Sequence, residues 1–224
     1  MWGQRCAAWV TRLPSTVLPA DIQRWIRPCE CDSVRFLRTP MLQPSGAAVL
    51  RFTSEARAQT WCSTQPPARL GGEEIRTQTV DLEDADLRER EHYAGFSPEL
   101  VSVVDIAAAQ PMQAVLLSNL PLQTTADKLE KKLDRSYALN ASMPKCTWPI
   151  SRLVGAPIPS TVPAVWKLPP AHPESASAWF LVRLQTMSEA LRLVRSWHRT
   201  RFLPQRFTLA QTGDRYVVEA HLMY

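Results

Sequence analysis

The chain has 224 residues, of which 45% are hydrophobic and 21% charged, a composition typical of one large or two small globular domains. This balance excludes an intrinsically disordered chain, and the longest apolar runs are well short of the roughly 20 residues of a membrane-spanning helix. The net charge of +5 is unevenly spread, with +4 over residues 1–80, −6 over residues 81–112 and +7 over residues 113–224. Two basic blocks that flank an acidic connector suit a polyanionic partner.

The first basic block is predicted to form strand, helix, strand, strand, helix, strand. Strands are expected at residues 7–14, 33–40, 46–52 and the end of 70–80, because apolar residues alternate there. Pro19 suits the first turn of a helix, and the second helix, over 53–63, is expected to pack Ala58, Trp61 and Cys62 inward. The apolar stripe of the first helix is Leu18, Ile22, Trp25 and Ile26.

The acidic connector follows. DLEDADLRERE, residues 81–91, is predicted to be a solvated helix or linker. In residues 97–112, Pro98 comes early and apolar residues recur at helical spacing, which predicts a short helix that packs on one domain.

The second basic block repeats the order of the first. AVLLSNLP, 114–121, is predicted to be a strand, and Thr124 with Asp127 would cap the next helix. A second strand is expected over 146–153, where Pro149 would make it an edge, and the six prolines of 157–173 predict a loop. Strand 177–184, a helix capped by Thr186 with Glu189, and a last strand in 215–224 complete the block. That helix would bury Met187, Ala190, Leu191, Val194 and Trp197.

The repeated βαββαβ pattern predicts an α+β chain of two ferredoxin-like domains. Each would have a four-stranded antiparallel sheet with two helices on one face. We expect domain 1 at residues 1–81, an acidic, partly helical connector at 82–112, and domain 2 at 113–224 with the proline-rich loop 157–173.

Both blocks resemble the RNA recognition motif. The first strand of that family has the form aliphatic-aromatic-aliphatic-any-Asn-Leu, which VLLSNL (115–120) and AWVTRL (8–13) follow, with Arg12 in the asparagine position of the second. The third strand carries an octamer that SGAAVLRF (45–52) and SAWFLVRL (177–184) match in part. The resemblance covers nearly the whole chain apart from the connector and the proline-rich loop.

The resemblance implies that single-stranded RNA lies on the open sheet face, where aromatic side chains stack unpaired bases. Alternation directs Ala48, Leu50 and Phe52 toward the helices, and Phe180, Val182 and Leu184 likewise. The candidate RNA-binding residues are Trp9, Thr11, Arg12, Arg51, Leu116, Ser118, Asn119, Trp179, Leu181 and Arg183. A slip of one residue in register would instead bury the tryptophans.

The outward sheet faces of the two blocks depart from the family pattern. Each keeps one outward aromatic residue for stacking, Trp9 in the first block and Trp179 in the second. The sequence therefore predicts a single-stranded RNA-binding protein of RNA metabolism or processing, or alternatively a protein-interaction scaffold within a ribonucleoprotein.

The acidic connector has a second interpretation, in which it lies over a basic sheet and competes with RNA. The arginine-rich segment of Arg192, Arg195, Arg199, Arg201 and Arg206 is expected to be a solvated face, with phosphate contact as the alternative.

No catalytic motif is present: the chain lacks a Gly-x-Ser-x-Gly elbow and a phosphate-cradling glycine loop. The five cysteines form no Cys-x-x-Cys pair and the histidines lack metal-ligand spacing, so a reducing compartment fits best. Cys29 and Cys31 would need a second pair to bind a metal. We expect no enzyme, metal, cofactor, small-molecule substrate or membrane association.

The compartment is expected to be the nucleus or the cytoplasm. No apolar core of a signal peptide follows Met1. Residues 1–20 lack acidic side chains and include Arg5 and Arg12, as a mitochondrial transit peptide would, but residues 7–14 have the pattern of a strand of the fold. The mitochondrion therefore stays an alternative.

Overall fold

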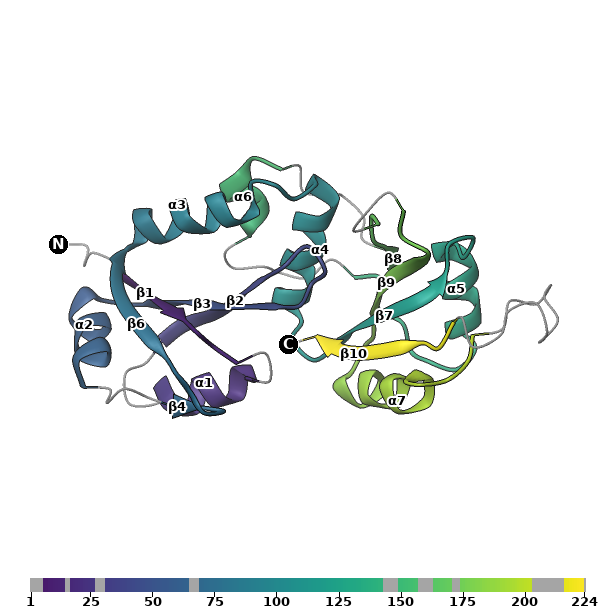
Figure 1. Ribbon diagram of the computed structural model, residues 1–224, viewed down its shortest axis with the longest axis horizontal. Coiled ribbons are helices and arrows are strands. Elements are labelled where there is room, and N and C mark those ends of the chain that lie inside the picture. Colours follow the sequence, from purple (N-terminus) through teal and green to yellow (C-terminus); the bar gives the residue numbers. More distant parts are fainter. Residues whose placement is uncertain are drawn as a thin grey trace. The chain divides into compact units, whose positions relative to one another are not determined.

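The computed structural model divides the chain into two compact units (Figure 1). Unit 1 is Met1–Ser97 with Ile150–Ala156, and unit 2 is Pro98–Pro149 with Pro157–Tyr224. The structure describes residues 6–14, 17–26, 31–64, 69–142, 149–156, 163–170, 174–202 and 216–223. Cys29, Cys146 and Arg206 lie outside these ranges. No helix among the described residues is long and apolar enough to cross a membrane.

Unit 1 has the predicted order of elements. These are β1 (Cys6–Thr11), α1 (Pro19–Ile26), β2 (Cys31–Arg38), β3 (Pro44–Phe52), α2 (Glu55–Thr64) and β6 (Arg76–Asp81), with a short hairpin of β4 (Arg69–Leu70) and β5 (Glu73–Glu74) before β6. The four main strands form an antiparallel sheet in the order β2-β3-β1-β6.

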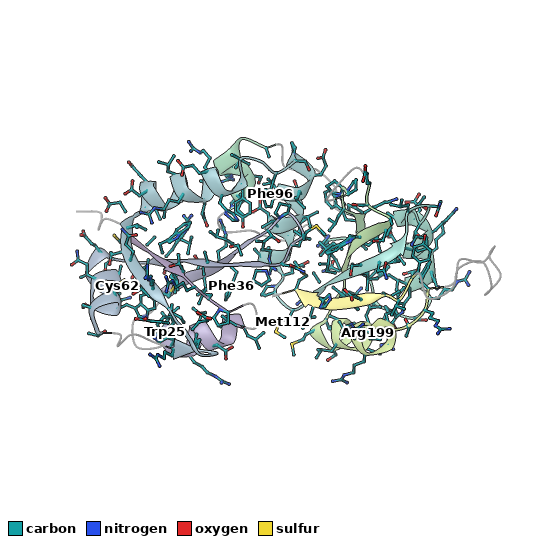
Figure 2. All side chains as sticks on the ribbon, in the orientation of Figure 1. Trp25, Phe36, Cys62, Phe96, Met112 and Arg199 are labelled. Carbon is teal, nitrogen blue, oxygen red and sulfur yellow. The ribbon has the colours of Figure 1, made fainter. Side chains whose placement is uncertain are left out.

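The core of unit 1 lies between this sheet and helices α1 and α2. Ala48, Leu50 and Phe52 are at most 1% exposed and belong to it, which confirms the predicted register of β3. Trp25 meets Trp61 edge-to-face at 5.0 Å between ring centroids, and Figure 2 shows Trp25 and Phe36 on this side of the sheet. The expectation for Leu18 was wrong: it precedes α1 and is 38% exposed, because the helix buries only its inner stripe.

The acidic connector forms two helices, α3 (Leu82–Tyr93) and α4 (Pro98–Ala109). α3 belongs to unit 1 and lies on the sheet face opposite to α1 and α2 (Figure 1). The prediction of a solvated connector was wrong for this side of α3, because Ala85, Glu89 and Tyr93 are at most 1% exposed. The structure instead agrees with the other interpretation, in which the connector lies over the basic sheet. α4 belongs to unit 2 and is buried from Leu100 to Ala107.

Unit 2 repeats the strand order of unit 1. Its elements are β7 (Ala114–Pro121), α5 (Ala126–Leu133), β8 (Val165–Lys167), β9 (Ser177–Arg183), α7 (Met187–Trp197) and β10 (Glu219–Met223), and its sheet runs β10-β7-β9-β8. All neighbouring strands are antiparallel. Phe180, Val182 and Leu184 are fully buried in the helix-side core, as predicted.

The second strand of unit 2 differs from the prediction. Ile150–Val154 is a short helix, α6, which belongs to unit 1 and packs against α3, and its Leu153 carbonyl accepts a 2.9 Å hydrogen bond from Arg90 Nε. The edge strand is instead β8, within the segment predicted to be a loop. Pro163 and Pro169 flank β8 rather than interrupt it, and its Val165 is fully buried.

The helix caps and the face of α7 are partly as predicted. Thr186 caps α7, where its Oγ1 accepts from Glu189 N at 3.2 Å. The cap of α5 is Thr125 rather than Thr124, since it is the Thr125 side chain that accepts from Lys128 N. On α7 the buried residues are Ala190 and Leu193, whereas Met187 in the first turn is 45% exposed.

Candidate nucleic-acid interface

The outward face of the unit 1 sheet carries the residues predicted to contact RNA. One cross-strand row holds Gln78, Trp9, Val49 and Arg35, and the next holds Val80, Ala7, Arg51 and Ser33. In an antiparallel sheet such opposite side chains are close neighbours. The predicted register therefore places Trp9 and Arg51 on one surface, in adjacent rows.

Helix α3 lies across this surface and neutralises its arginines. Arg51 Nη2 is 2.6 Å from Asp86 Oδ1 and 2.9 Å from Glu89 Oε2, and Arg35 Nη1 is 3.3 Å from the same Glu89 oxygen. The Glu89 side chain is 0% exposed and that of Arg51 6%. Because the two arginines come from adjacent strands and hold one buried carboxylate between them, the sheet presents an anion site that the chain itself fills.

The C-terminal end of α3 is fixed to the end of β2. Tyr93 Oη accepts from Arg38 N at 3.1 Å, and His92 Nε2 lies 2.9 Å from Arg38 O. Burial is the main reason that the pKa of Tyr93 is raised to about 12. Tyr93, His92 and Phe96 also pack as a ring cluster, with Tyr93 and Phe96 edge-to-face at 5.0 Å.

Trp9 is only partly covered. The Arg88 guanidinium lies 5.6 Å from the centroid of the Trp9 ring, and Arg88 also donates to Gln78 Oε1 at 3.2 Å. Thr11 is partly exposed and Arg12 is exposed. A base stacked on Trp9 would therefore take the place of Arg88, whereas a phosphate at Arg51 would require α3 itself to move away.

Unit 2 also buries much of its outward face. One row across its sheet holds His221, Leu116, Leu181 and Trp166. Leu116 is 3% exposed and Leu181 is fully buried. The next outward position of β9, Arg183, is 1% exposed, donates to Gln110 Oε1 at 2.9 Å and to the Ser142 carbonyl, and has a pKa lowered by burial.

Tryptophans nevertheless stay partly exposed on the unit 2 sheet. Trp179 is two residues before Leu181 on β9, and Trp166 stands opposite Leu181 on the edge strand β8. Residues in these diagonal positions are within reach of each other when they are aromatic. Trp166 was missed in the sequence because it lies in the proline-rich segment; the alternation Val-Trp-Lys between two prolines is the signal that could have identified it.

Asn119 and Arg12 occupy equivalent positions at the ends of β7 and β1. Both have a left-handed backbone, with φ of +62°. The register of β7 against β9 shifts between Leu117 and Leu120, so Asn119 sits in a bulge, after which the strand continues to Pro121. Its Nδ2 donates to Val217 O at 2.9 Å. Asparagine adopts this conformation more readily than most other non-glycine residues, which suits it to this position in the bulge. Ser118 beside it is 3% exposed.

The described cysteines show no sign of a reactive or metal-binding site. Cys6, Cys31 and Cys62 are free thiols, and burial raises the pKa of each, that of Cys31 to about 11. Cys31 Sγ donates to Arg51 O at 3.2 Å. No cluster of three or more histidine, cysteine or acidic side chains suited to a metal ion occurs within the described ranges.

Comparison with known proteins finds similarity in structure alone. No protein-family model matches the chain, and no curated protein is similar to it in sequence. Sex-lethal RNA recognition domains 1 and 2 from Drosophila melanogaster match at 14% identity over 96% of this chain and 98% of that chain, with a TM-score of 0.32. The G-rich RNA sequence binding factor 1 from Homo sapiens matches at 17% identity over 42% of this chain and 99% of that chain, with a TM-score of 0.34.

The fold of the two units follows from their own topology. In each, the first strand lies between the third and the fourth, and the second strand is at the edge beside the third. Two helices cover one face of each sheet (Figure 1). This strand order and helix placement is that of the split βαββαβ motif, so the chain contains two ferredoxin-like domains in tandem.

Proposed function

We propose that the chain binds single-stranded RNA, and that the partly exposed tryptophans of the two sheets stack its bases. The observation that carries this proposal is that Trp9 and Trp179 keep accessible surface on the outward faces, although their neighbours Val49 and Leu181 are at most 1% exposed. Stacking on an aromatic side chain contributes about 1–3 kcal/mol per base. Trp166 adds a second ring on the unit 2 sheet.

The polar residues beside the tryptophans would position the RNA backbone. Arg12 is exposed at the end of β1, and Asn119 is partly exposed at the corresponding place on β7. In this proposal Arg12 and Thr11 contact phosphate or sugar in unit 1, and Asn119 does so in unit 2. Ser118 is 3% exposed, so it would contact RNA only after the segment that covers it moves. Arg51, Leu116, Leu181 and Arg183 are 5% exposed or less, so they would contact RNA only after their covering segments move.

The burial of these four residues favours a second function, that of a protein-interaction scaffold. A sheet face that the chain itself covers is a packed surface, and the partner of such a domain would bind elsewhere. The chain would then associate with RNA only through other proteins of a ribonucleoprotein. Both functions use the same fold, and direct binding of RNA by the pure protein distinguishes them.

The test is fluorescence anisotropy of the pure full chain with labelled mixed-sequence single-stranded RNA, at low and moderate salt. Trp9→Leu with Trp179→Leu removes two aromatic faces while it keeps apolar bulk. We expect at least a tenfold loss of affinity, or about 1.4 kcal/mol. Trp25→Leu is the matched control, because Trp25 is also partly exposed but packs on the helix side, and it should leave RNA affinity unchanged.

Two results would favour the scaffold. One is the absence of RNA binding by the pure protein at low salt. The other is binding that is equally strong in the double variant and in the Trp25→Leu control. Circular dichroism and thermal unfolding of each variant show whether a weaker signal comes from unfolding.

A further inference from the structure

The helix side of unit 2 carries a concentration of positive charge that the sheet does not use. Residues 126–137 and 187–201, which contain α5, α7 and the turns after them, hold eight Lys and Arg and four Asp and Glu. The basic side chains are exposed: Lys128, Lys131, Lys132, Arg135, Arg192, Arg195, Arg199 and Arg201. Figure 2 labels Arg199, just beyond the end of α7.

The charges on α5 and in the turn after it are sorted by sign. Lys128, Lys131, Lys132 and Arg135 recur at intervals of three and four residues, which places them on one side of a helix. Asp127, Glu130 and Asp134 recur at the same intervals on another side. A helix that is merely solvated has no need for this separation, since alternating signs would give more favourable i,i+4 pairs.

The basic side of α5 faces α7, as two contacts show. Lys132 Nζ lies 4.3 Å from the centroid of the Phe202 ring and 5.3 Å from that of Trp197. Arg192 stacks at 4.8 Å over Tyr137 and donates to the carbonyl of Ser136. Lys132 and Arg192 therefore connect the two helical segments, and we call the exposed basic residues of α5, α7 and the turns after them the α5–α7 face.

Partly exposed aromatic rings lie among these cations. Trp197, Phe202 and Tyr137 all keep some accessible surface beside Lys132 and Arg192. Cations attract phosphates of any sequence, and rings offer stacking surface for unpaired bases. The combination fits single-stranded nucleic acid better than an acidic peptide, which would use the cations and leave the rings without a role.

Several cations of the α5–α7 face have no structural role within the described residues. The side chains of Lys128, Lys131, Arg135 and Arg195 have no hydrogen bond or ion pair there. Arg192, by contrast, bonds to Glu189 at 2.6 Å. The four can meet phosphates without any cover being displaced, unlike Arg51 on the unit 1 sheet.

We propose that the α5–α7 face is a second RNA-binding surface, which contacts the phosphate backbone of single-stranded RNA on the side of unit 2 opposite to its sheet. The inference rests on the proposed function for its choice of RNA as the polyanion. It does not depend on either sheet, so RNA binding at this face is compatible with sheets that stay covered.

The experiment compares two variants of the full chain that lose the same charge. The first is Lys128→Ala, Lys131→Ala, Arg135→Ala and Arg195→Ala together. The control is Arg24→Ala, Arg57→Ala, Arg69→Ala and Arg76→Ala together, which removes four exposed arginines of unit 1. The probe is labelled poly-uridine RNA, titrated by anisotropy between about 50 mM and about 200 mM salt.

For single strands, removal of one phosphate-binding cation reduces the slope of log K against log salt by about 0.7. We expect the first variant, which loses four cations, to show a slope smaller by up to about 3 and an affinity at least tenfold weaker, with smaller changes in the control. Equal changes in the two variants, or none in the first, would overturn the inference. Thermal unfolding checks that each variant is folded. A third variant keeps the four charges, with Lys128→Arg, Lys131→Arg, Arg135→Lys and Arg195→Lys together, and it should bind RNA as the unchanged chain does.

The Trp9→Leu and Trp179→Leu variant separates this inference from the proposed sheet platforms. Binding that survives in the tryptophan variant but not in the lysine and arginine variant supports the α5–α7 face and contradicts stacking on the sheets. The reverse result contradicts the α5–α7 face and supports the sheets. No RNA binding by the unchanged chain at low salt overturns both, and tighter binding of single-stranded DNA of matched sequence overturns the choice of RNA.

Discussion

Glu89 provides the most direct test of how α3 is held on the unit 1 sheet. Its carboxylate is fully buried between Arg51 at 2.9 Å and Arg35 at 3.3 Å. Glu89→Gln keeps the shape of the side chain but leaves two buried guanidinium groups with one fewer anion. Removal of one partner of a buried ion pair costs about 3–5 kcal/mol.

The lower end of that range applies, because Arg51 keeps Asp86 at 2.6 Å. We expect the free energy of unfolding to fall by about 3 kcal/mol, and the melting temperature by about 6–12 °C for a chain of this size. Urea unfolding followed by circular dichroism measures the first and a thermal scan the second. Glu91→Gln is the matched control on the same helix, and since Glu91 is exposed its change should stay within about 0.5 kcal/mol.

The same variant reports on the function of the covered face. If α3 competes with RNA for Arg51, a cover weakened by about 3 kcal/mol raises the open population, and with it the apparent RNA affinity, by up to about 100-fold. Glu89→Gln as stable as the unchanged chain would refute the energetic argument. Lower stability without any gain in RNA affinity would refute competition and leave α3 as a structural part of unit 1.

Five further predictions concern single residues. Arg12→Asn should stabilise the chain by about 1 kcal/mol, because asparagine tolerates the left-handed backbone better, and Asn119→Ala should destabilise it by about 1–2 kcal/mol, since it also removes a hydrogen bond; urea midpoints test both. The pKa of Tyr93 is raised to about 12, so the folded state favours the neutral phenol. The contribution of Tyr93 to the free energy of unfolding is therefore fully present below pH 10 and is lost as the pH rises toward 12. Tyr93→Phe should lessen that loss in alkaline unfolding. Cys31, with a pKa of about 11, should react with iodoacetamide at neutral pH far more slowly than the amino acid cysteine does in solution. Trp166→Leu should weaken RNA binding to an extent similar to Trp179→Leu in the anisotropy assay.

Alternation along the strands was enough to predict the fold and the faces of the sheets. In the second half of β3 and in β9 every second residue is apolar, and those residues are the ones buried against the helices. The side of the sheet on which Trp9 and Trp179 lie followed from the same pattern. What alternation cannot report is whether another element covers the outward face, because that depends on a segment elsewhere in the chain.

The sequence of the connector contains one indication that α3 covers the unit 1 sheet. Ala85, Glu89 and Tyr93 are four residues apart, so they share one side of a helix, but the charge of Glu89 makes that side look solvated. Only the outward arginines of β2 and β3 explain its burial. The second strand of unit 2 was missed for a different reason. β8 is only three residues long, so its alternation is a weak signal, and the surrounding prolines favoured the prediction of a loop.

The placement of α6 has a consequence for the order of events during synthesis. The unit 1 sheet is complete once residue 81 has emerged, and its cover α3 ends at Tyr93, but the helix that packs on α3 arrives only with residues 150–154. At about 5–20 residues per second, the roughly 70 residues between the sheet and this helix take about 4–15 s to make. A nascent chain therefore passes through an interval in which the basic sheet face exists and α3 lacks its outer support, and in that interval the face is most open to a polyanion.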